Sequence, residues 1–169
     1  MKNLFKVMFL GIALFVMSGT TQAQVKIAHV NTDEVLEAMP EYSKAAKDLE
    51  KYYGDLQNQL QAMYQEYQSK AQDYEANQAT MSNLVKQSKE KEIGDLMNRI
   101  NQFQNNAGQE LDAKREELQK PIIEKVKKAI DTVGKEKGFT YVLDSSIPIY
   151  IAADAPDITK DVKAKLNLK

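Results

Sequence analysis

The residue types that usually perform acid–base, nucleophilic or metal chemistry are scarce in this sequence. It has one histidine, His29, and no cysteine, so neither a second imidazole nor a thiolate exists to complete a zinc site. No histidine is placed to activate a serine as a nucleophile, and Gly134-Lys135 lacks the rest of a phosphate-binding loop. The sequence therefore predicts a protein that is not an enzyme and that holds no cofactor or metal. His29 is most simply a packed strand residue.

Side chains suited to noncovalent contact with apolar segments are more abundant. Methionine and exposed aromatic side chains form adaptable surfaces that bind varied partners. We predict that a client polypeptide contacts six such residues: Tyr52, Met63, Tyr64, Tyr67, Met97 and Phe103. A second candidate contact is a lysine cluster, Lys86, Lys89 and Lys91, which is interleaved with Glu90 and Glu92. The alternative interpretations are core packing for the aromatic residues and a solvated turn for the lysines.

These residues lie on two stretches of heptad-spaced apolar positions, which form the seam of a predicted helical hairpin. Spacings that alternate between three and four residues are typical of coiled coils. The seam positions are Ala46, Leu49, Tyr53, Leu56, Leu60, Met63, Tyr67 and Tyr74, then Ile93, Leu96, Ile100, Phe103 and Ala107. Tyr52 and Tyr64 fall beside the seam, so we expect their rings to face outward.

The hairpin is predicted to span residues 40–135 as an arm. Pro40 fits the first turn of its first helix, and about 40 helical residues make a rod of roughly 60 Å. We place the tip between about Ala79 and Lys89, and a helix that passes uninterrupted through this region is the alternative. The return helix is predicted from about Lys89 to Lys135, with a kink at Pro121 and an end at Gly134 and Gly138.

The remaining segments, 24–39 and 136–169, predict a small base with three strands, so that the fold class is α+β. The strands are expected at 25–30, 139–144 and 147–152, with Pro148 indicating an edge. Short helices are expected at 34–39, capped by Thr32 or Asp33, and at 158–166. So small a base cannot bury all of its apolar residues, and we expect closed cyclic association through Ile27, Val30, Val142, Leu143, Ile149 and Ile151.

Residues 1–23 are predicted to be a secretory signal peptide, cleaved after about Ala23. Lys2 and Lys6 precede an apolar run, and small polar residues follow it; an uncleaved anchor is the alternative. The periplasm is therefore the expected location. Removing two lysines from 23 basic residues leaves 21 against 24 acidic residues. This mildly acidic balance gives no general attraction to nucleic acid or anionic lipid.

The whole mature chain resembles the Skp/OmpH family of periplasmic chaperones for outer-membrane proteins. The resemblance rests on the order of elements and on two short signals, Val142-Leu143-Asp144 at a strand end and Asp157-Ile158-Thr159-Lys160-Asp161-Val162 at a helix start. It implies a homotrimer with a shared β core, whose hairpin arms enclose an unfolded β-barrel precursor without ATP. Well-known members are strongly basic, so no lipid-binding site is carried over to this acidic chain, and contact with membrane or lipopolysaccharide stays open.

A structural adaptor of a cell-envelope complex is the alternative function. Periplasmic coiled-coil hairpins also bridge components of export machines, but such proteins usually carry lipoyl-like or barrel domains beside the hairpin. The few short strands here do not suffice for one. A pull-down would separate the two hypotheses, because a chaperone captures unfolded barrels and an adaptor captures folded complexes.

Overall fold

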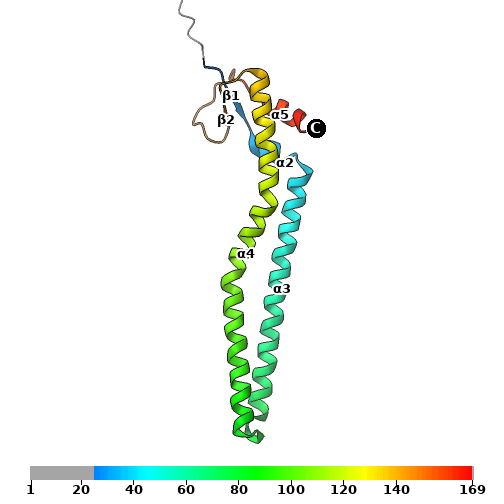
Figure 1. Ribbon diagram of the computed structural model, residues 1–169, viewed down its shortest axis with the longest axis vertical. Helices are drawn as coiled ribbons and strands as arrows, with labels where there is room; N and C mark the ends of the chain where they lie inside the picture. The colour runs from blue at the N-terminus through cyan, green and yellow to red at the C-terminus, as the bar shows by residue number, and fades with distance from the viewer. Residues whose placement is uncertain (1–24, 169) are drawn as a thin grey trace, which may run out of the picture.

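The structure is a computed structural model that describes residues 25–168 of the chain. Figure 1 shows a long rod of two antiparallel helices with a small base at one end. The first rod helix is α3, Pro40–Asn77, and the second is α4, Asn83–Lys137. The base consists of β1, Ile27–Val30, α2, Thr32–Glu37, β2, Tyr141–Asp144, and α5, Thr159–Lys165. The predicted hairpin arm and its base are therefore both present.

A single hydrophobic core holds the base to the near end of the rod. Strand β1, helices α2 and α5, and the facing sides of α3 and α4 all contribute to it. Its buried members are Ala28, Val30, Val35, Met39, Ala45, Ile122, Val126, Ala129, Val133, Ile158 and Val162. Burial of these side chains removes apolar surface from water, which is the main favourable contribution to folding of so small a unit.

The sheet of the base has two parallel strands, and the expectation of a third strand at 147–152 is wrong for the single chain. Strand β1 pairs with β2 along one edge, while its other edge makes a bridge between His29 and Asp157. No edge of β1 is therefore left for another strand. Beyond β2, Ser145 N donates to the Val30 carbonyl, and the segment that follows runs as a loop.

The short helix α2 begins earlier than predicted. Its cap is Asn31 rather than Thr32 or Asp33: the Asn31 side-chain oxygen accepts a hydrogen bond from Glu34 N at 3.0 Å. An asparagine oxygen satisfies a backbone donor that the first helical turn leaves unpaired. Thr32 is then free to bond elsewhere, and its hydroxyl donates to the carboxylate of Asp144.

The tip of the hairpin lies at the near end of the predicted range. A short 3₁₀ turn, η1, Gln78–Thr80, follows α3, and α4 begins at Asn83 with Ser82 as its cap. The Ser82 hydroxyl accepts a hydrogen bond from Val85 N at 3.4 Å. The polar segment that we expected to form the turn is therefore helical, since its lysines, glutamates and glutamine are good helix formers.

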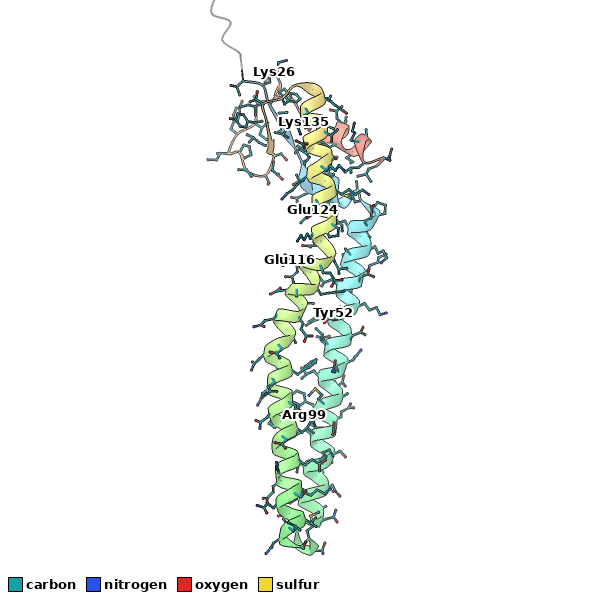
Figure 2. All side chains as sticks on the ribbon, in the orientation of Figure 1. Lys26, Tyr52, Arg99, Glu116, Glu124 and Lys135 are labelled. Atoms are coloured by element: carbon teal, nitrogen blue, oxygen red, sulfur yellow. The ribbon has the colours of Figure 1, made fainter. Side chains whose placement is uncertain are left out.

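Helix α4 continues through Pro121 and bends, as predicted. Figure 2 shows the bend at the level of Glu116, about one turn before the proline. Proline removes one backbone donor, and its ring crowds the carbonyl four residues earlier. The helix ends at Lys137, with Gly138 in the left-handed region at φ 69°. Gly134 does not end the helix: it is buried, and a Cβ there would lie 3.3 Å from Val142 Cγ2, so its small size lets α4 approach β2.

Candidate binding surfaces of the arm and base

The distal half of the arm is closely packed along the predicted seam. Leu96 and Ile100 of α4 are buried, with Ile100 0% exposed. Two ion pairs also join α3 to α4: Lys70 Nζ lies 2.5 Å from Glu92 Oε1, and Lys89 Nζ lies 2.9 Å from Asp73 Oδ2. The hydrogen bond with Glu92 raises the pKa of Lys70, and that with Lys89 lowers the pKa of Asp73. These exposed pairs each add little stability, so the buried seam carries most of it.

The predicted client-binding residues line the edges of the seam rather than a separate outer face. Tyr52, Met63, Tyr67, Met97 and Phe103 are half-buried, and Tyr64 is more exposed. Whether they touch a client remains a prediction.

Two of these tyrosines also join the helices. Tyr52 Oη donates to Glu110 Oε2 at 3.3 Å (Figure 2), and Tyr64 Oη accepts from Gln104 Nε2 at 3.2 Å. Partial desolvation and the neighbouring Glu110 carboxylate raise the pKa of Tyr52. The expectation that both rings face outward therefore needs correction, because their hydroxyl groups reach across to α4.

The lysines predicted at the tip lie on the first turns of α4. Lys86 and Lys89 are half-buried and Lys91 is exposed. The end of the hairpin itself presents two apolar side chains that our site prediction omitted, Leu84, which is 77% exposed, and Val85. The signal was available in the sequence, since both residues fall within the expected tip and immediately precede the polar run 86–92.

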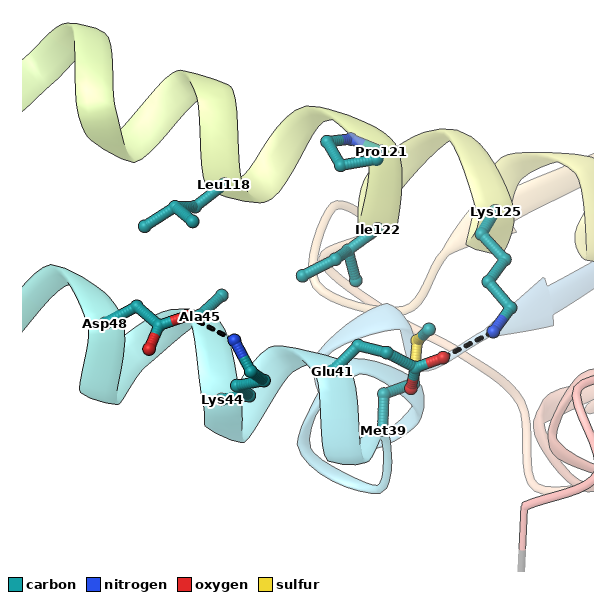
Figure 3. A pocket seen from close by; sticks show the side chains of 9 residues that line it. All are labelled: Met39, Glu41, Lys44, Ala45, Asp48, Leu118, Pro121, Ile122 and Lys125. Carbon is teal, nitrogen blue, oxygen red and sulfur yellow. Dashed lines mark hydrogen bonds and ion pairs between the residues drawn. The ribbon is translucent and has the colours of Figure 1, made fainter.

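Two openings between α3 and α4, besides a smaller one lined in part by Tyr42, Leu49 and Leu118, lie where the seam is incompletely filled. The one nearer the base has a volume of about 290 Å³ and lies beside Pro121 (Figure 3). Its rim carries two ion pairs, Lys125 Nζ to Glu41 Oε1 at 2.5 Å and Lys44 Nζ to Asp48 Oδ2 at 2.6 Å. The lysine hydrogen bonds lower the pKa of Glu41 and of Asp48. The other opening, in the middle of the arm, has a volume of about 240 Å³ and an almost entirely apolar lining.

The base exposes an apolar patch that no part of the described chain covers. Of the predicted interface residues, Ile27 and Leu143 are exposed, Ile149 is fully exposed, and Val142 and Ile151 are half-buried. Alternation along the strands places exposed Tyr141 on the same face as Leu143. Further exposed residues that we had not selected are Val25, which precedes β1, and Ile147 and Tyr150 of the loop.

Val30 does not belong to this patch. It is 2% exposed and lies in the core of its own chain, contrary to the expectation that a single chain leaves it partly exposed. The reason is the pleat of the strand, because neighbouring side chains point to opposite faces. Exposed Ile27 and buried Val30 therefore lie on different faces of β1.

Two aspartates fix the ends of the base segments. Asp144 Oδ1 accepts hydrogen bonds from Ser146 N at 2.9 Å and Ser146 Oγ at 2.7 Å, and its other oxygen accepts from Thr32. Asp157 Oδ1 accepts from Thr159 N at 2.8 Å and Thr159 Oγ1 at 2.6 Å. Burial alone would raise the pKa of both carboxyl groups, but these hydrogen bonds outweigh it and lower both pKa values. The aspartates of the two short sequence signals therefore have a structural role: Asp144 orders the turn after β2, and Asp157 orders the start of α5.

The described residues contain no cluster of metal-binding side chains. Within 25–168, no cluster of three or more histidine, cysteine, aspartate or glutamate side chains could hold a metal ion. His29 lies half-buried in β1, and its Nδ1 atom has no hydrogen-bond partner. Across the same range, every helix is too short in its apolar stretches to cross a bilayer.

Comparison with known proteins gives consistent matches over most of the chain. A family model described as outer membrane protein (OmpH-like) matches residues 26–166. Chaperone protein Skp of Photorhabdus luminescens is 31% identical over 165 residues, which cover 96% of this chain and 97% of that protein. Chaperone protein Skp of Pectobacterium atrosepticum is 30% identical over 148 residues, covering 86% and 87%.

A solved structure is similar in fold. It is that of a putative outer membrane chaperone (OmpH-like) from Caulobacter crescentus, with a TM-score of 0.72 and 15% sequence identity. The likeness covers 89% of each chain. The arrangement of a long hairpin on a small base therefore recurs at low sequence identity.

Proposed function

Because this chain belongs to the OmpH-like family, we propose that it is a chaperone that holds unfolded outer-membrane proteins between helical arms without using ATP. The observation that carries the proposal is the near-complete match to relatives named Chaperone protein Skp, which extends over base and arm alike. The rod supports it, because its openings are shallow and its surface mixes aromatic, methionine and charged side chains. Such a surface suits many weak contacts rather than one specific ligand.

The working form is a homotrimer joined through the base. The supporting observation is the apolar patch around Ile149, Tyr141 and Leu143, which a single chain leaves in water. Contiguous exposed apolar surface usually marks an interface, and the outer edge of β2 and the 147–152 loop can complete a shared sheet between neighbouring copies. Closed cyclic symmetry covers the patch on every copy, so three arms project from one base and surround a cavity.

The chaperone acts in the periplasm after export and cleavage near Ala23. The support is the basic, apolar and small-residue order of residues 1–23, which lie outside the described residues. Base segments 24–39 and 136–169 then serve assembly, and the arm, 40–135, serves the client. The residues of the arm that meet the client are Tyr52, Met63, Tyr64, Tyr67, Met97 and Phe103, with the lysines near the tip as a second contact.

The direct test is whether the mature chain, from Gln24 onward, keeps a denatured barrel protein from aggregating. A urea-denatured outer-membrane protein is diluted into buffer with and without the chain, in the absence of ATP, while light scattering is recorded and native mass spectrometry weighs the products. We expect suppressed scattering and a mass of three chains plus one barrel. Unchanged scattering at several-fold excess of the chain would refute the proposal, and capture of folded envelope complexes instead would favour an adaptor.

A further inference from the structure

The opening in the middle of the arm is a gap in the coiled-coil seam. It lies between α3 and α4 in the middle of the rod, outside the core of the base, and its volume is about 240 Å³. Eight residues line this mid-arm pocket: Tyr53, Leu56, Gln57, Leu60, Phe103, Ala107, Gly108 and Leu111.

The gap follows from residue size at the seam. On α4, buried Ile100 fills the seam on the tip side of the pocket, and the next large apolar residue beyond its base-side end is half-buried Leu118. Between them Ala107 occupies a seam position, and Gly108 follows, with open space where a Cβ would stand. Because Ala107 and Gly108 are small residues, they leave space opposite Leu56 and Leu60 of α3. Both leucines therefore remain only half-buried.

The lining selects for an uncharged, apolar occupant. No lysine, arginine, aspartate or glutamate lines the pocket, although 28% of the chain is charged. At its edge the Tyr53 ring is 49% exposed, and its hydroxyl accepts a hydrogen bond from Gln57 Nε2 at 2.8 Å. A charged group that entered the pocket would lose its hydration without gaining a hydrogen-bond or ion-pair partner, which costs free energy. An apolar group would not incur this cost.

The size and the aromatic walls favour a ring. An enclosed apolar cavity of about 150 Å³ lined by leucine, isoleucine and phenylalanine binds benzene; this pocket is larger and open to solvent on one side, and its lining is also mainly apolar. Phe103 and Tyr53 offer ring faces and edges for offset or edge-to-face contact. We propose that the mid-arm pocket binds one aromatic side chain of the polypeptide that the arms hold. The proposal rests on the proposed function, and it names a defined subsite within the otherwise dispersed surface of the arm.

The test uses tryptophan as the probe, because the chain itself contains none. The mature chain is titrated with N-acetyl-tryptophanamide and with a short uncharged peptide that carries one tryptophan, and the indole emission is recorded. We expect a saturable shift of the emission to shorter wavelength. Ala107→Leu, which fills the pocket, should weaken both probes at least tenfold, and Ala107→Met, whose flexible side chain adapts to the space, should act in the same direction.

Ala113→Leu is the matched control. Ala113 is an exposed residue of α4 that does not line the pocket, so the same substitution there should leave probe binding unchanged. Helix content by circular dichroism shows that each variant is folded. Equal binding by wild type and both Ala107 variants, or a shift that never saturates, would overturn the proposal. A change of oligomeric mass in the Ala107 variants alone would also overturn the proposal. Such a change would indicate that a second copy of the chain, and not a client side chain, occupies the pocket.

The same variants separate this proposal from the proposed function. If wild type suppresses aggregation of the barrel while the Ala107 substitutions change neither probe binding nor holding, the pocket proposal fails and the chaperone proposal stands. If wild type leaves the barrel to aggregate although the probes bind at Ala107, the chaperone proposal fails, and the pocket loses its proposed occupant with it.

Discussion

At the scale of single residues, two aspartates make hydrogen bonds that order the segments of the base. Asp144 ties the end of β2 to Thr32, and Asp157 fixes the start of α5 through Thr159. Thr159 Oγ1 also accepts a hydrogen bond from Asn31 N at 2.9 Å. These contacts connect segments more than 100 positions apart in sequence. Residues that looked like family signatures are therefore the parts that hold the base together.

Acid should destabilise the base through these two carboxylates. Their folded pKa values lie below the ordinary value of 3.8, so the native state stabilises the charged form. That stability is fully present above about pH 4 and is lost as the pH falls through the folded pKa values. Urea unfolding at a series of pH values should show this loss in wild type and a shallower pH dependence in Asp144→Asn and Asp157→Asn.

Asp154→Asn is the control for this pH dependence. Asp154 is an exposed carboxylate in the loop before α5, and its replacement should leave the wild-type curve intact. A wild-type stability that stays flat from about pH 5 to pH 2 would contradict the assigned role of the two hydrogen-bonded carboxylates.

At the scale of elements, the arm is packed unevenly along its length. The distal part has Leu96 and Ile100 fully buried, and the end next to the base joins the main core. Between these regions lie the mid-arm pocket, the opening beside Pro121 and the bend of α4. Since helix pairs of this length owe their stability to the apolar stripe between them, the two packed regions hold the hairpin together.

Truncating the distal seam should loosen the far end of the arm alone. Ile100→Ala removes a fully buried side chain, which costs about 2–5 kcal/mol when the cavity does not collapse. Hydrogen exchange followed by mass spectrometry should show faster exchange in the tip-proximal parts of α3 and α4 and unchanged exchange in the base. Leu84→Ala, at an exposed tip position, should change the stability by about 0.5 kcal/mol or less. The exchange rates should therefore stay almost the same as in wild type. Equal acceleration in the base would show that the arm is not packed in separate regions.

At the scale of the whole molecule, the base and the long arm place the proposed assembly surface and the proposed client-binding surface in different parts of the chain. The rod extends away from the base (Figure 1). The exposed apolar residues of the base lie at β1, on β2 and in the loop after β2. In the proposed trimer, assembly through the base would leave the arms free to meet a client. Residues 24–169 carry 21 basic against 24 acidic residues, a balance that gives no strong long-range field, so in the proposed complex short-range contacts would provide most of the affinity.

The assembly should depend on Ile149. The side chain is fully exposed in the single chain, so Ile149→Asp costs the isolated fold little but places a charge in the proposed interface, where burial without a partner is strongly unfavourable. Native mass spectrometry should show a trimer for wild type and smaller species for the variant, with the helical signal of the arm retained. Leu84→Asp, an equally polar change at the tip, should stay trimeric. A trimer with Ile149→Asp would place the interface elsewhere.

The sequence by itself determined the two long helices of this protein and the residue types available for chemistry. Heptad spacing identified the two long helices, Pro40 and Gly138 marked their outer ends, and the absence of cysteine and of a second histidine left few options for chemistry. These features are local, because periodicity and end signals operate within a few residues of one another.

Only the tertiary structure decided which of these residues are available for contact. Segment 147–152 runs as a loop beside the outer edge of β2 instead of forming the expected third strand, and Val30 is buried because the core shared by α2, α4 and α5 covers its face of β1. The mid-arm pocket likewise depends on which residues of α3 stand opposite Ala107. Such pairings join positions far apart in the chain, and their register follows from packing of the whole hairpin on its base rather than from any local pattern.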